Sequence, residues 1–478
     1  MYTILDCYTD EPAGLGVPPY IGTYPRYIAG KLISENKKYN YITIDDLRYM
    51  HLKKKNKSLK TDIKTYNRTG NVNKILNKTK TLIVICGVHV PGKYLSALPG
   101  TLHEVSKLIK DIHNARKILA GPAATEFGTR LEGGKKAEKT DISIFDDIMQ
   151  TESYKKIAKY ATIGADIVKK IQWETIAEIE TSRGCRRKTG CSFCTEPLKH
   201  RLEFREVKDI LAEAKELRKN NVMHFRLGKQ SDFFSWSAKD IEKILKGISK
   251  LDVKTLHIDN VDPVSVTEEK VKLVVKYCTP GNVAALGIES FDEIVVKENN
   301  LNSTPEKSME AIRIINKYGK SIGENGMPKF LPGINILFGL KGESKKTHEK
   351  NMQYLMQILD EELLVRRINI RQVAAFPGTK LYDDCGNKFV KKNKKYYWKW
   401  RNEIRQKIDN TMLKKLVPVS SVLKQVRMEV HDGNTTFGRQ FGTYPLVVGV
   451  KQRLELGKYH DIKVVGHMLR SVVGEIIK

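Results

Sequence analysis

Three cysteines lie within ten positions near the middle of the chain, in the stretch IAEIETSRGCRRKTGCSFCTEP from Ile176 to Pro197. Cys185, Cys191 and Cys194 place three thiolates on one loop, where they can hold a metal centre. Structural zinc takes four ligands, usually as two separated pairs, and no second CxxC or HxxxH pair follows. A 4Fe-4S cluster normally takes four cysteines, so three leave one iron free for a substrate or cofactor. The residues favour an iron-sulfur cluster with an open position, and zinc is the alternative.

The cysteine triplet resembles the cluster loop of the radical S-adenosylmethionine (radical SAM) superfamily. The resemblance includes Phe193, directly before the last cysteine, which in that family packs near the adenine. Five residues separate the first two cysteines here, where the family usually has three. The resemblance implies that S-adenosylmethionine chelates the open iron and is reductively cleaved to a 5′-deoxyadenosyl radical, which takes hydrogen from the substrate. It further implies that losing any one of the three cysteines abolishes turnover.

From Trp173 to about Tyr382 the sequence alternates strand, loop and helix six times, which predicts a partial (β/α)6 barrel. The predicted strands begin at Ile176 and then cover 223–227, 255–258, 283–288, 334–338 and 368–373, with an amphipathic helix at 206–220. Ligands of such barrels collect at the carboxyl ends of the strands. Alternation along the sixth strand places only one of Arg371 and Gln372 toward the interior.

The radical SAM resemblance also implies cofactor-binding residues at these strand ends: Gly228, Lys229, Gln230, Asn260, Glu289, Ser290 and Gly339. The turn 228–230 stands where the family holds the methionine amino group. Asn260 and the pair 289–290 stand where family members place polar groups on the ribose, although Glu289 has an alternative role as a helix cap. Gly339, in INILFGLKGES, is similar to the turn that lies along the adenine.

Ahead of the barrel, apolar runs at 2–7, 41–44, 81–86 and 117–119 predict the strands of a Rossmann-like parallel sheet, with a helix near Tyr24. This order resembles the cobalamin-binding domain of one radical SAM subclass. That subclass often binds cobalt through an Asp-x-His-x-x-Gly motif. His89 and Gly92 keep half of the motif, but Gly87 replaces the Asp, so we expect the sheet and treat cobalamin as an alternative cofactor.

Beyond Leu381 the composition changes to KKNKKYYWKW, residues 391–400, which mixes cations with aromatic side chains. This stretch suits either a phosphate backbone with stacked bases or a helix whose aromatics pack on the barrel. The last part alternates like short strands and resembles the β barrel that many RNA-modifying radical enzymes append. The predicted domains are therefore 1–165, Rossmann-like; 170–390, radical SAM barrel; and 391–478, a basic linker with a β-rich module.

The chain of 478 residues carries 84 basic and 55 acidic residues, a net charge of +29 that favours a polyanionic partner such as nucleic acid. A general lysine bias of the composition is the alternative explanation. Seven cysteines, four of them scattered, do not form a disulfide framework, which indicates a reducing compartment. No signal peptide or membrane-length apolar run is visible, so we expect a cytoplasmic protein without a membrane partner.

A narrower resemblance covers nearly the whole chain. ETSRGC with GCSFCTEP, HFRLGKQSD, IDNVDP, GIESFD and GRQFGTYPLVVGV resemble the archaeal radical SAM subunit of archaeosine synthase. In that family a partner subunit attaches lysine to a 7-deazaguanine base of tRNA, and the radical subunit, acting as a lyase, breaks the lysine C–N bond. The implied partners are tRNA, the lysine-transferring subunit and a reductant protein. Relatives usually continue into a helix-hairpin-helix segment, whereas this sequence stops at Lys478.

Three other functions stay open. A methylthiotransferase shares the barrel and the terminal β module, but it needs three further cysteines in the N-terminal domain, where only Cys7 and Cys86 occur. A cobalamin-dependent radical SAM methyltransferase fits the order of the domains. A non-catalytic RNA-binding protein with zinc explains the charge and the cysteines, but it does not explain the barrel pattern.

Overall fold

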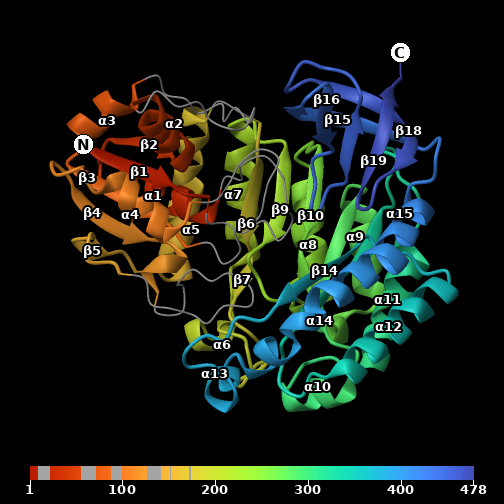
Figure 1. Cartoon of the computed structure of the whole chain (residues 1–478). Coiled ribbons are helices and arrows are strands. Elements are labelled where there is room, and N and C mark those ends of the chain that lie inside the picture. Colours follow the sequence, from red (N-terminus) through yellow and green to blue (C-terminus); the bar gives the residue numbers. More distant parts are fainter. Residues whose placement is uncertain are drawn as a thin grey trace.

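The chain folds into an N-terminal parallel sheet, a central partial barrel and a C-terminal β barrel, which run from red to blue in Figure 1. The computed structural model describes residues 1–8, 22–54, 71–87, 100–125, 141–150, 152–171 and 174–477. The predicted α/β fold is confirmed in all three parts. His89 and Gly92, the two remaining positions of the cobalt-binding motif, lie outside the described residues.

The N-terminal sheet has five parallel strands in the order β2-β1-β3-β4-β5. Its strands are β1 (Tyr2–Asp6), β2 (Tyr39–Thr43), β3 (Thr81–Ile85), β4 (Arg116–Ala120) and β5 (Asp147–Ile148). Short apolar runs such as TLIVI form these strands because helices cover a parallel sheet on both faces. The helices are α1 (Thr23–Ser34), α2 (Ile44–Lys54), α3 (Val72–Lys78), α4 (Leu102–Ile109) and α5 (Tyr154–Ile163). This sheet is the predicted Rossmann-like one.

All six predicted barrel strands are present and parallel, in two sheets ordered β10-β9-β6 and β11-β12-β13-β14. The strands are β6 (Ile176–Glu180), β9 (His224–Gly228), β10 (Thr255–Ile258), β11 (Asn260–Val261), β12 (Asn282–Glu289), β13 (Phe330–Phe338) and β14 (Arg367–Gln372). The third predicted strand continues past Asp259 as the short β11, and this step divides the barrel sheet into two. The outer wall consists of α7 (Val207–Lys219), α8 (Ala238–Ser249), α9 (Glu268–Tyr277), α10 (Glu293–Glu298), α11 (Pro305–Gly319) and α12 (Lys345–Asp360).

Local sequence explains where the wall helices begin and which face they bury. In α8, the Ser237 side chain accepts a hydrogen bond from the backbone N–H of Asp240 and caps the helix. Ile241, Leu245 and Ile248 then follow at helical spacing and are fully buried. The same combination of a polar cap and an apolar stripe repeats in α9 and α11. These helices pack on the strands and leave the strand ends open for ligands.

The C-terminal part begins with helices and ends in a closed barrel of strands ordered β15-β16-β17-β19-β18. The helices are α13 (Lys380–Asp384), α14 (Lys388–Ile404), a π-helical turn at Arg405–Asp409, and α15 (Asn410–Leu416). The strands are β15 (Val422–Asp432), β16 (Thr435–Arg439), β17 (Val447–Val450), β18 (Tyr459–His467) and β19 (Ser471–Ile476). The predicted β module is therefore present. The proposed domain boundary at 390 falls inside α14, because this helix packs on the barrel.

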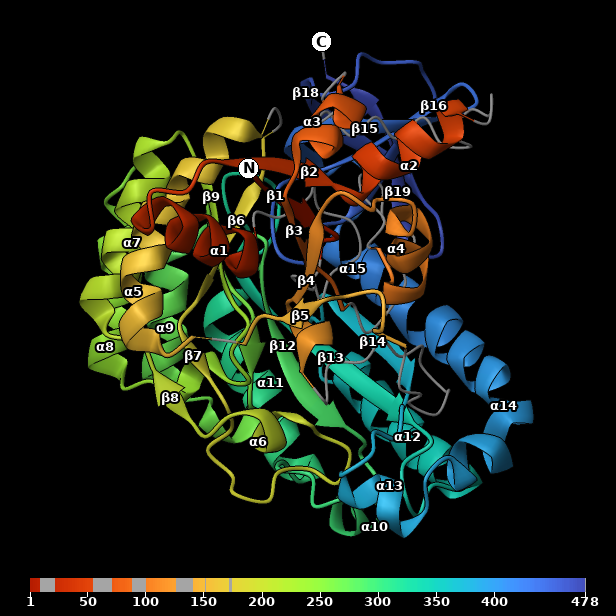
Figure 2. The ribbon, with the colours of Figure 1, turned by 90° about the vertical axis from the view of Figure 1, so that its left-hand side faces the viewer.

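Figure 2 shows α1 and α5 beside α7, where the N-terminal domain meets the barrel wall. In Figure 1, the loop that precedes α6 (Glu196–Lys199) lies at the lower end of the barrel and the C-terminal β barrel lies at its upper end. The carboxyl ends of the barrel strands therefore face the cysteine loop, and their amino ends face the C-terminal β barrel.

Candidate metal centre

The cysteine loop leaves the barrel at the end of β6 and is closed on itself by local contacts. After β7 (Ser182–Arg183), Gly184 adopts φ +82°, and a Cβ atom there would lie 2.2 Å from the Arg201 carbonyl oxygen. The Gly184 N–H donates to Glu196 Oε1 at 3.0 Å. β7 pairs with β8 (Glu203–Phe204), so both ends of the loop are fixed. Only glycine fits where the chain at position 184 passes the Arg201 backbone, and this turn directs the next residues toward the barrel mouth.

Cys185, Cys191 and Cys194 are all half-buried and free of disulfides. Their sulfur atoms accept N–H groups: the backbone N–H of Arg187 lies 3.4 Å from Cys185 Sγ, Arg187 Nη1 lies 3.5 Å from Cys191 Sγ, and the backbone N–H of Glu196 lies 3.4 Å from Cys194 Sγ. Such donors stabilise thiolates, the form that binds metal. Arg187 thus donates hydrogen bonds to two of the three cysteines.

Burial, together with the charge of neighbouring cysteines, raises the pKa of Cys191 to about 12 and that of Cys194 to about 11. Bound iron reverses this effect because its positive charge deprotonates a coordinating thiol. Among the described residues, no three metal-ligating side chains are placed to hold a single ion. Three cysteines on one loop beside the carboxyl ends of the barrel strands fit an iron-sulfur cluster with one iron left open.

Glu289 ends β12 beside this loop. Its φ of +65° is rare for a non-glycine residue, and the β12–β13 register shifts at the same point. Burial raises the pKa of Glu289 to about 7, and the nearby Arg371 guanidinium opposes that rise. The capping alternative is wrong, because Asp292 caps α10 through the backbone N–H of Ile294. Strained backbone of this kind costs roughly 1–3 kcal/mol and clusters at functional sites. Of the two candidate side chains on β14, Arg371 lies near enough to Glu289 for its charge to act on the carboxyl.

The turn after β9 comes together with the end of β10. Gln230 is buried, and its Nε2 donates to the Leu227 carbonyl at 2.8 Å while its Oε1 accepts from Thr181 at 3.3 Å. Asn260 Nδ2 donates to the Gln230 carbonyl at 3.0 Å. Lys229 instead extends to the N-terminal domain, where its Nζ donates to Thr23 Oγ1 at 3.0 Å. The structure thus joins Gln230 and Asn260, and it directs Lys229 to a different element.

Three other predicted residues lie in the cysteine loop and directly after β13 and β12. Phe193 packs in an apolar cluster with Leu340 at the end of β13. Gly339 has φ +92°, and a Cβ atom there would lie 2.3 Å from Val390 Cγ2, so the turn requires glycine. Ser290 is buried and accepts from the backbone N–H of Asp292 at 3.1 Å, which is a local structural contact. Cofactor binding by these residues stays a prediction.

The barrel interior contains a chain of buried charges that the sequence patterns did not single out. Arg226 on β9 lies 3.4 Å from Glu178 Oε1 on β6 and pairs with Asp259 after β10. The Tyr444 hydroxyl, from the loop between β16 and β17, donates to Asp259 Oδ1 at 3.2 Å. The available signal was the polar residues that alternate with apolar ones along these strands, as in IAEIE and HFRLG.

Comparison with known proteins agrees with this geometry. The profile of the radical SAM superfamily matches residues 179–355. An uncharacterized protein of Methanocaldococcus jannaschii is 43% identical over 99% of this chain and 93% of its own length. The ribosomal protein uS12 methylthiotransferase RimO of Clostridioides difficile is 21% identical over 71% of this chain and 79% of its own length.

Among solved structures, the radical S-adenosylmethionine methyltransferase TsrM of Kitasatospora setae has the same fold. The two chains are 12% identical with a TM-score of 0.52, over 80% of this chain and 74% of that one. No helix in the described part of this chain is long and apolar enough to cross a membrane. The superfamily uses a 4Fe-4S cluster with S-adenosylmethionine. With the cysteine loop at the mouth of a parallel six-unit barrel and the profile match over that barrel, the chain belongs to the radical SAM superfamily.

Proposed function

We propose that this radical SAM enzyme modifies a base of tRNA and that Cys185, Cys191 and Cys194 hold its 4Fe-4S cluster. When bound, the reduced cluster and S-adenosylmethionine supply a 5′-deoxyadenosyl radical that removes hydrogen from the substrate. The chain's own residues bind and orient the reactants. Arg187 and the backbone N–H of Glu196 stabilise the thiolates, and the loop is fixed on both sides of the mouth.

The strand ends supply the cofactor contacts in this proposal. Glu289 faces the mouth and accepts hydrogen bonds from the ribose hydroxyls. The Gln230 carbonyl, which Asn260 holds in place at 3.0 Å, accepts from the methionine amino group through its second lone pair. Phe193 and the Gly339 turn form the apolar side that receives the adenine.

The proposal of an RNA substrate rests on helix α14, which buries one face and exposes another. Its inner face packs on the barrel, with Tyr397 and Trp400 at ring-centroid distances of 5.6 and 5.7 Å from Phe338. Its outer face exposes six lysines, at positions 388, 391, 392, 394, 395 and 399. Trp398, with 67% exposure, stands among them, and Glu403 is the only acidic residue of the helix. Cations around an exposed aromatic ring suit phosphates and a stacked base.

The position of α14 fits this role. Its beginning is tied to the mouth, because Asn393 Nδ2 donates to Glu343 Oε1 at 2.7 Å and the Gly339 N–H donates to Glu343 Oε2 at 2.6 Å. Its end continues through the π-helical turn into α15, which packs against the C-terminal β barrel. Helix α14 therefore runs from the mouth toward the β barrel (Figure 1). Its lysines lie along that path, as required to present one base while the backbone is held.

The reaction we propose follows from the archaeosine resemblance. A partner subunit attaches lysine to the 7-deazaguanine base, and this chain cleaves the lysine C–N bond to leave the amidine of archaeosine. Hydrogen abstraction beside the nitrogen starts the cleavage, and a separate reductant protein supplies the electron. The +29 charge agrees with a tRNA partner.

Cobalamin-dependent methyl transfer is a second candidate, supported by the fold shared with the methyltransferase TsrM, although the cavity between the N-terminal sheet and the barrel mouth does not accommodate the cofactor. Tyr24, Gly121 and Lys229 line this cavity, and its volume of about 60 Å³ is far below the size of a corrinoid. Methylthiotransfer has less support, because Cys7 and Cys86 are the only cysteines of residues 1–165 and both are buried. Neither candidate accounts for the basic face of α14.

The deciding experiment uses the anaerobically reconstituted protein with a reductant. Four irons per chain and release of 5′-deoxyadenosine would support the radical chemistry, whereas zinc without iron would reject it. Incubation with tRNA that carries the lysine adduct should give archaeosine by nucleoside mass spectrometry. An unchanged nucleoside, under conditions where S-adenosylmethionine is cleaved, would reject archaeosine formation; methyl transfer that depends on added cobalamin would favour the second candidate.

A further inference from the structure

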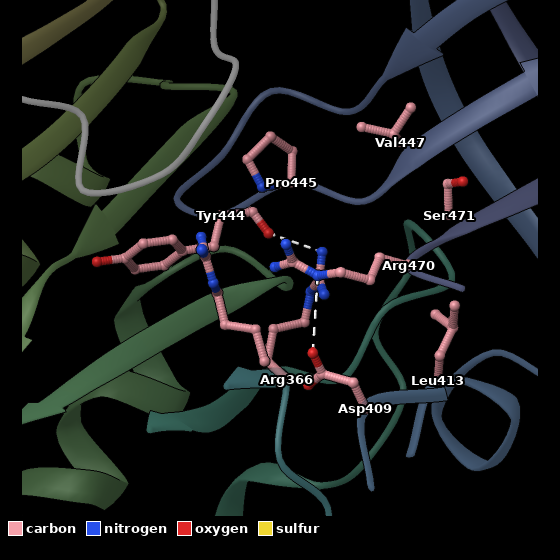
Figure 3. A pocket seen from close by; sticks show the side chains of 9 residues that line it. Arg366, Asp409, Leu413, Tyr444, Pro445, Val447, Arg470 and Ser471 are labelled. Atoms are coloured by element: carbon pink, nitrogen blue, oxygen red, sulfur yellow. Dashed lines mark hydrogen bonds and ion pairs between the residues drawn. The ribbon is translucent and has the colours of Figure 1, made fainter. Parts of the chain in front are cut away.

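A cavity of about 280 Å³ lies at the opposite end of the barrel from the cysteine loop, where β14 begins and the C-terminal β barrel is docked. Arg366 and Arg367 come from the start of β14, Arg470 from the start of β19, and Asp409 from the π-helical turn. Figure 3 shows Arg366, Arg470 and Asp409 pointing toward one another beneath Pro445. The volume is well above the ~10–15 Å³ that one water requires.

Positive charge exceeds negative charge among the lining residues. Three guanidinium groups line the cavity with a single carboxylate, that of Asp409. This carboxylate is already paired with the buried Arg405, and it lies 3.6 Å from Arg470 Nε. Burying arginines without matching carboxylates is costly unless another anion compensates them. At least two positive charges at this site are therefore not balanced by lining residues.

The arginines also keep hydrogen-bonding capacity. Arg366 Nη2 donates to the Tyr444 carbonyl at 2.7 Å, which leaves its other N–H groups for a ligand. Arg367 stacks over the Tyr444 ring at 4.6 Å, and its buried Nε–H has no acceptor among the described residues. Arg470 keeps 34% side-chain exposure, so the cavity is open to solvent at this residue.

The pKa values of the three arginines agree with an anion-binding role. Burial, together with neighbouring arginines, lowers the pKa of Arg366, Arg367 and Arg470 to about 10. Guanidinium groups prefer anions that present pairs of acceptor oxygens, which they bind through paired N–H groups. A phosphate group offers such oxygens and carries the required charge.

We propose that this cavity, lined by Arg366, Arg367 and Arg470, is a phosphate-binding site. The phosphate belongs either to the backbone of a bound RNA or to a free phosphate-bearing small molecule. This site is separate from the cysteine loop and does not depend on which reaction the enzyme performs, because it lies at the amino end of the same strand whose carboxyl end carries Arg371.

The test is the thermal unfolding of the reconstituted protein in increasing inorganic phosphate, with potassium chloride adjusted to constant ionic strength. The wild-type midpoint should rise and saturate with phosphate, because a ligand that binds only the folded state stabilises it. Arg367→Gln and Arg470→Gln should each weaken phosphate binding at least tenfold. Arg313→Gln, which removes an exposed arginine from α11, is the matched control and should respond like the wild type.

A tRNA-binding assay on the same variants distinguishes the two sources. If tRNA affinity falls in Arg367→Gln and Arg470→Gln and phosphate competes with tRNA, the site holds an RNA phosphate. If tRNA affinity is unchanged while phosphate binding is lost, the site holds a phosphate-bearing small molecule. An equal response of wild type and variants to phosphate, or an equal midpoint shift with potassium chloride alone, would overturn the proposal. Unchanged iron content in the variants shows that they are folded.

Discussion

Arg26 on α1 and Glu213 on α7 form an ion pair with an N···O distance of 2.9 Å, and neither side chain has any solvent exposure. Glu213 also pairs with Arg205 at 2.6 Å, and Arg26 Nη1 donates to the Gly22 carbonyl at 2.9 Å. The pair joins the N-terminal sheet domain to the barrel wall. The positive charges next to Glu213 keep its pKa below the usual value despite its burial.

The first prediction concerns this junction. Glu213→Ala leaves two buried arginines without their shared carboxylate, and breaking a buried pair from one side costs about 3–5 kcal/mol. We expect a loss of that size in the free energy of unfolding, measured by urea denaturation. Glu216→Ala, on the exposed surface of the same helix, is the control and should change stability little. Equal stability of the two variants would show that the junction does not need the pair.

The second prediction concerns the cysteines. Cys194→Ala should lose the iron-sulfur cluster, and with it the release of 5′-deoxyadenosine, because two thiolates cannot retain a cluster that needs three. Iron content and the visible absorption band measure the result. Cys385→Ala, which removes a half-buried thiol just after α13, should keep full iron content. Full iron content in Cys194→Ala would refute the ligand assignment.

The third prediction concerns the pH dependence of stability at Glu343. Burial raises the pKa of this carboxyl to about 7, although it accepts hydrogen bonds from the Gly339 N–H and from Asn393. In the unfolded chain the group titrates near pH ~4.3, so between these values the folded state holds a proton that the unfolded state has released. Stability from this group is therefore greatest at low pH, falls as pH rises to about 7, and is constant above it.

Glu343→Gln removes the titration and should remove this part of the slope. The measurement is the free energy of unfolding of both proteins between pH 4 and 8. Parallel curves for wild type and Glu343→Gln would show that the carboxyl does not titrate in this range.

The fourth prediction concerns the outer face of α14. Replacing Lys391, Lys394 and Lys395 by Glu should weaken tRNA binding and reduce the slope of log K against log salt by about 2–3, because roughly 0.7–0.9 counterions are released per phosphate contact. Fluorescence anisotropy over a salt series measures both quantities. Changing three exposed lysines of α8, at 239, 243 and 246, to Glu makes the same change of net charge elsewhere. Equal losses in both variants would indicate a general charge effect without a defined face.

The fifth prediction separates stacking from charge on the same helix. Trp398→Ala should weaken tRNA binding by about 1–3 kcal/mol, the usual value of one base stacked on an aromatic ring, and should leave the salt slope unchanged. Tyr396, with 38% exposure, stacks on Trp400 at 5.5 Å, so Tyr396→Ala is the matched control with a smaller expected effect. A change of slope in Trp398→Ala would contradict the stacking role.

The sequence determined the elements and their chemical types. Alternating apolar runs were sufficient to place all six barrel strands and four of the five strands of the N-terminal sheet, because the hydrophobic period is a local property; the two-residue β5 is too short to show one. The spacing of Cys185, Cys191 and Cys194 on one loop was equally local, and it carried the choice of an iron-sulfur centre. The composition of residues 391–400 allowed either packing on the barrel or contact with RNA. It did not show that the helix buries one face on the barrel and exposes its lysines on another.

Only the tertiary structure decided which distant side chains meet. The pairing of Arg226 with Asp259, the direction of Lys229 toward Thr23, and the meeting of Arg366 with Arg470 depend on strand register and on how domains dock. Alternation tells which face of a strand a residue occupies, but it does not identify the partner across the barrel. The sequence thus contained the cluster loop in one segment, whereas the arginine cavity exists only because the C-terminal β barrel closes over the start of β14.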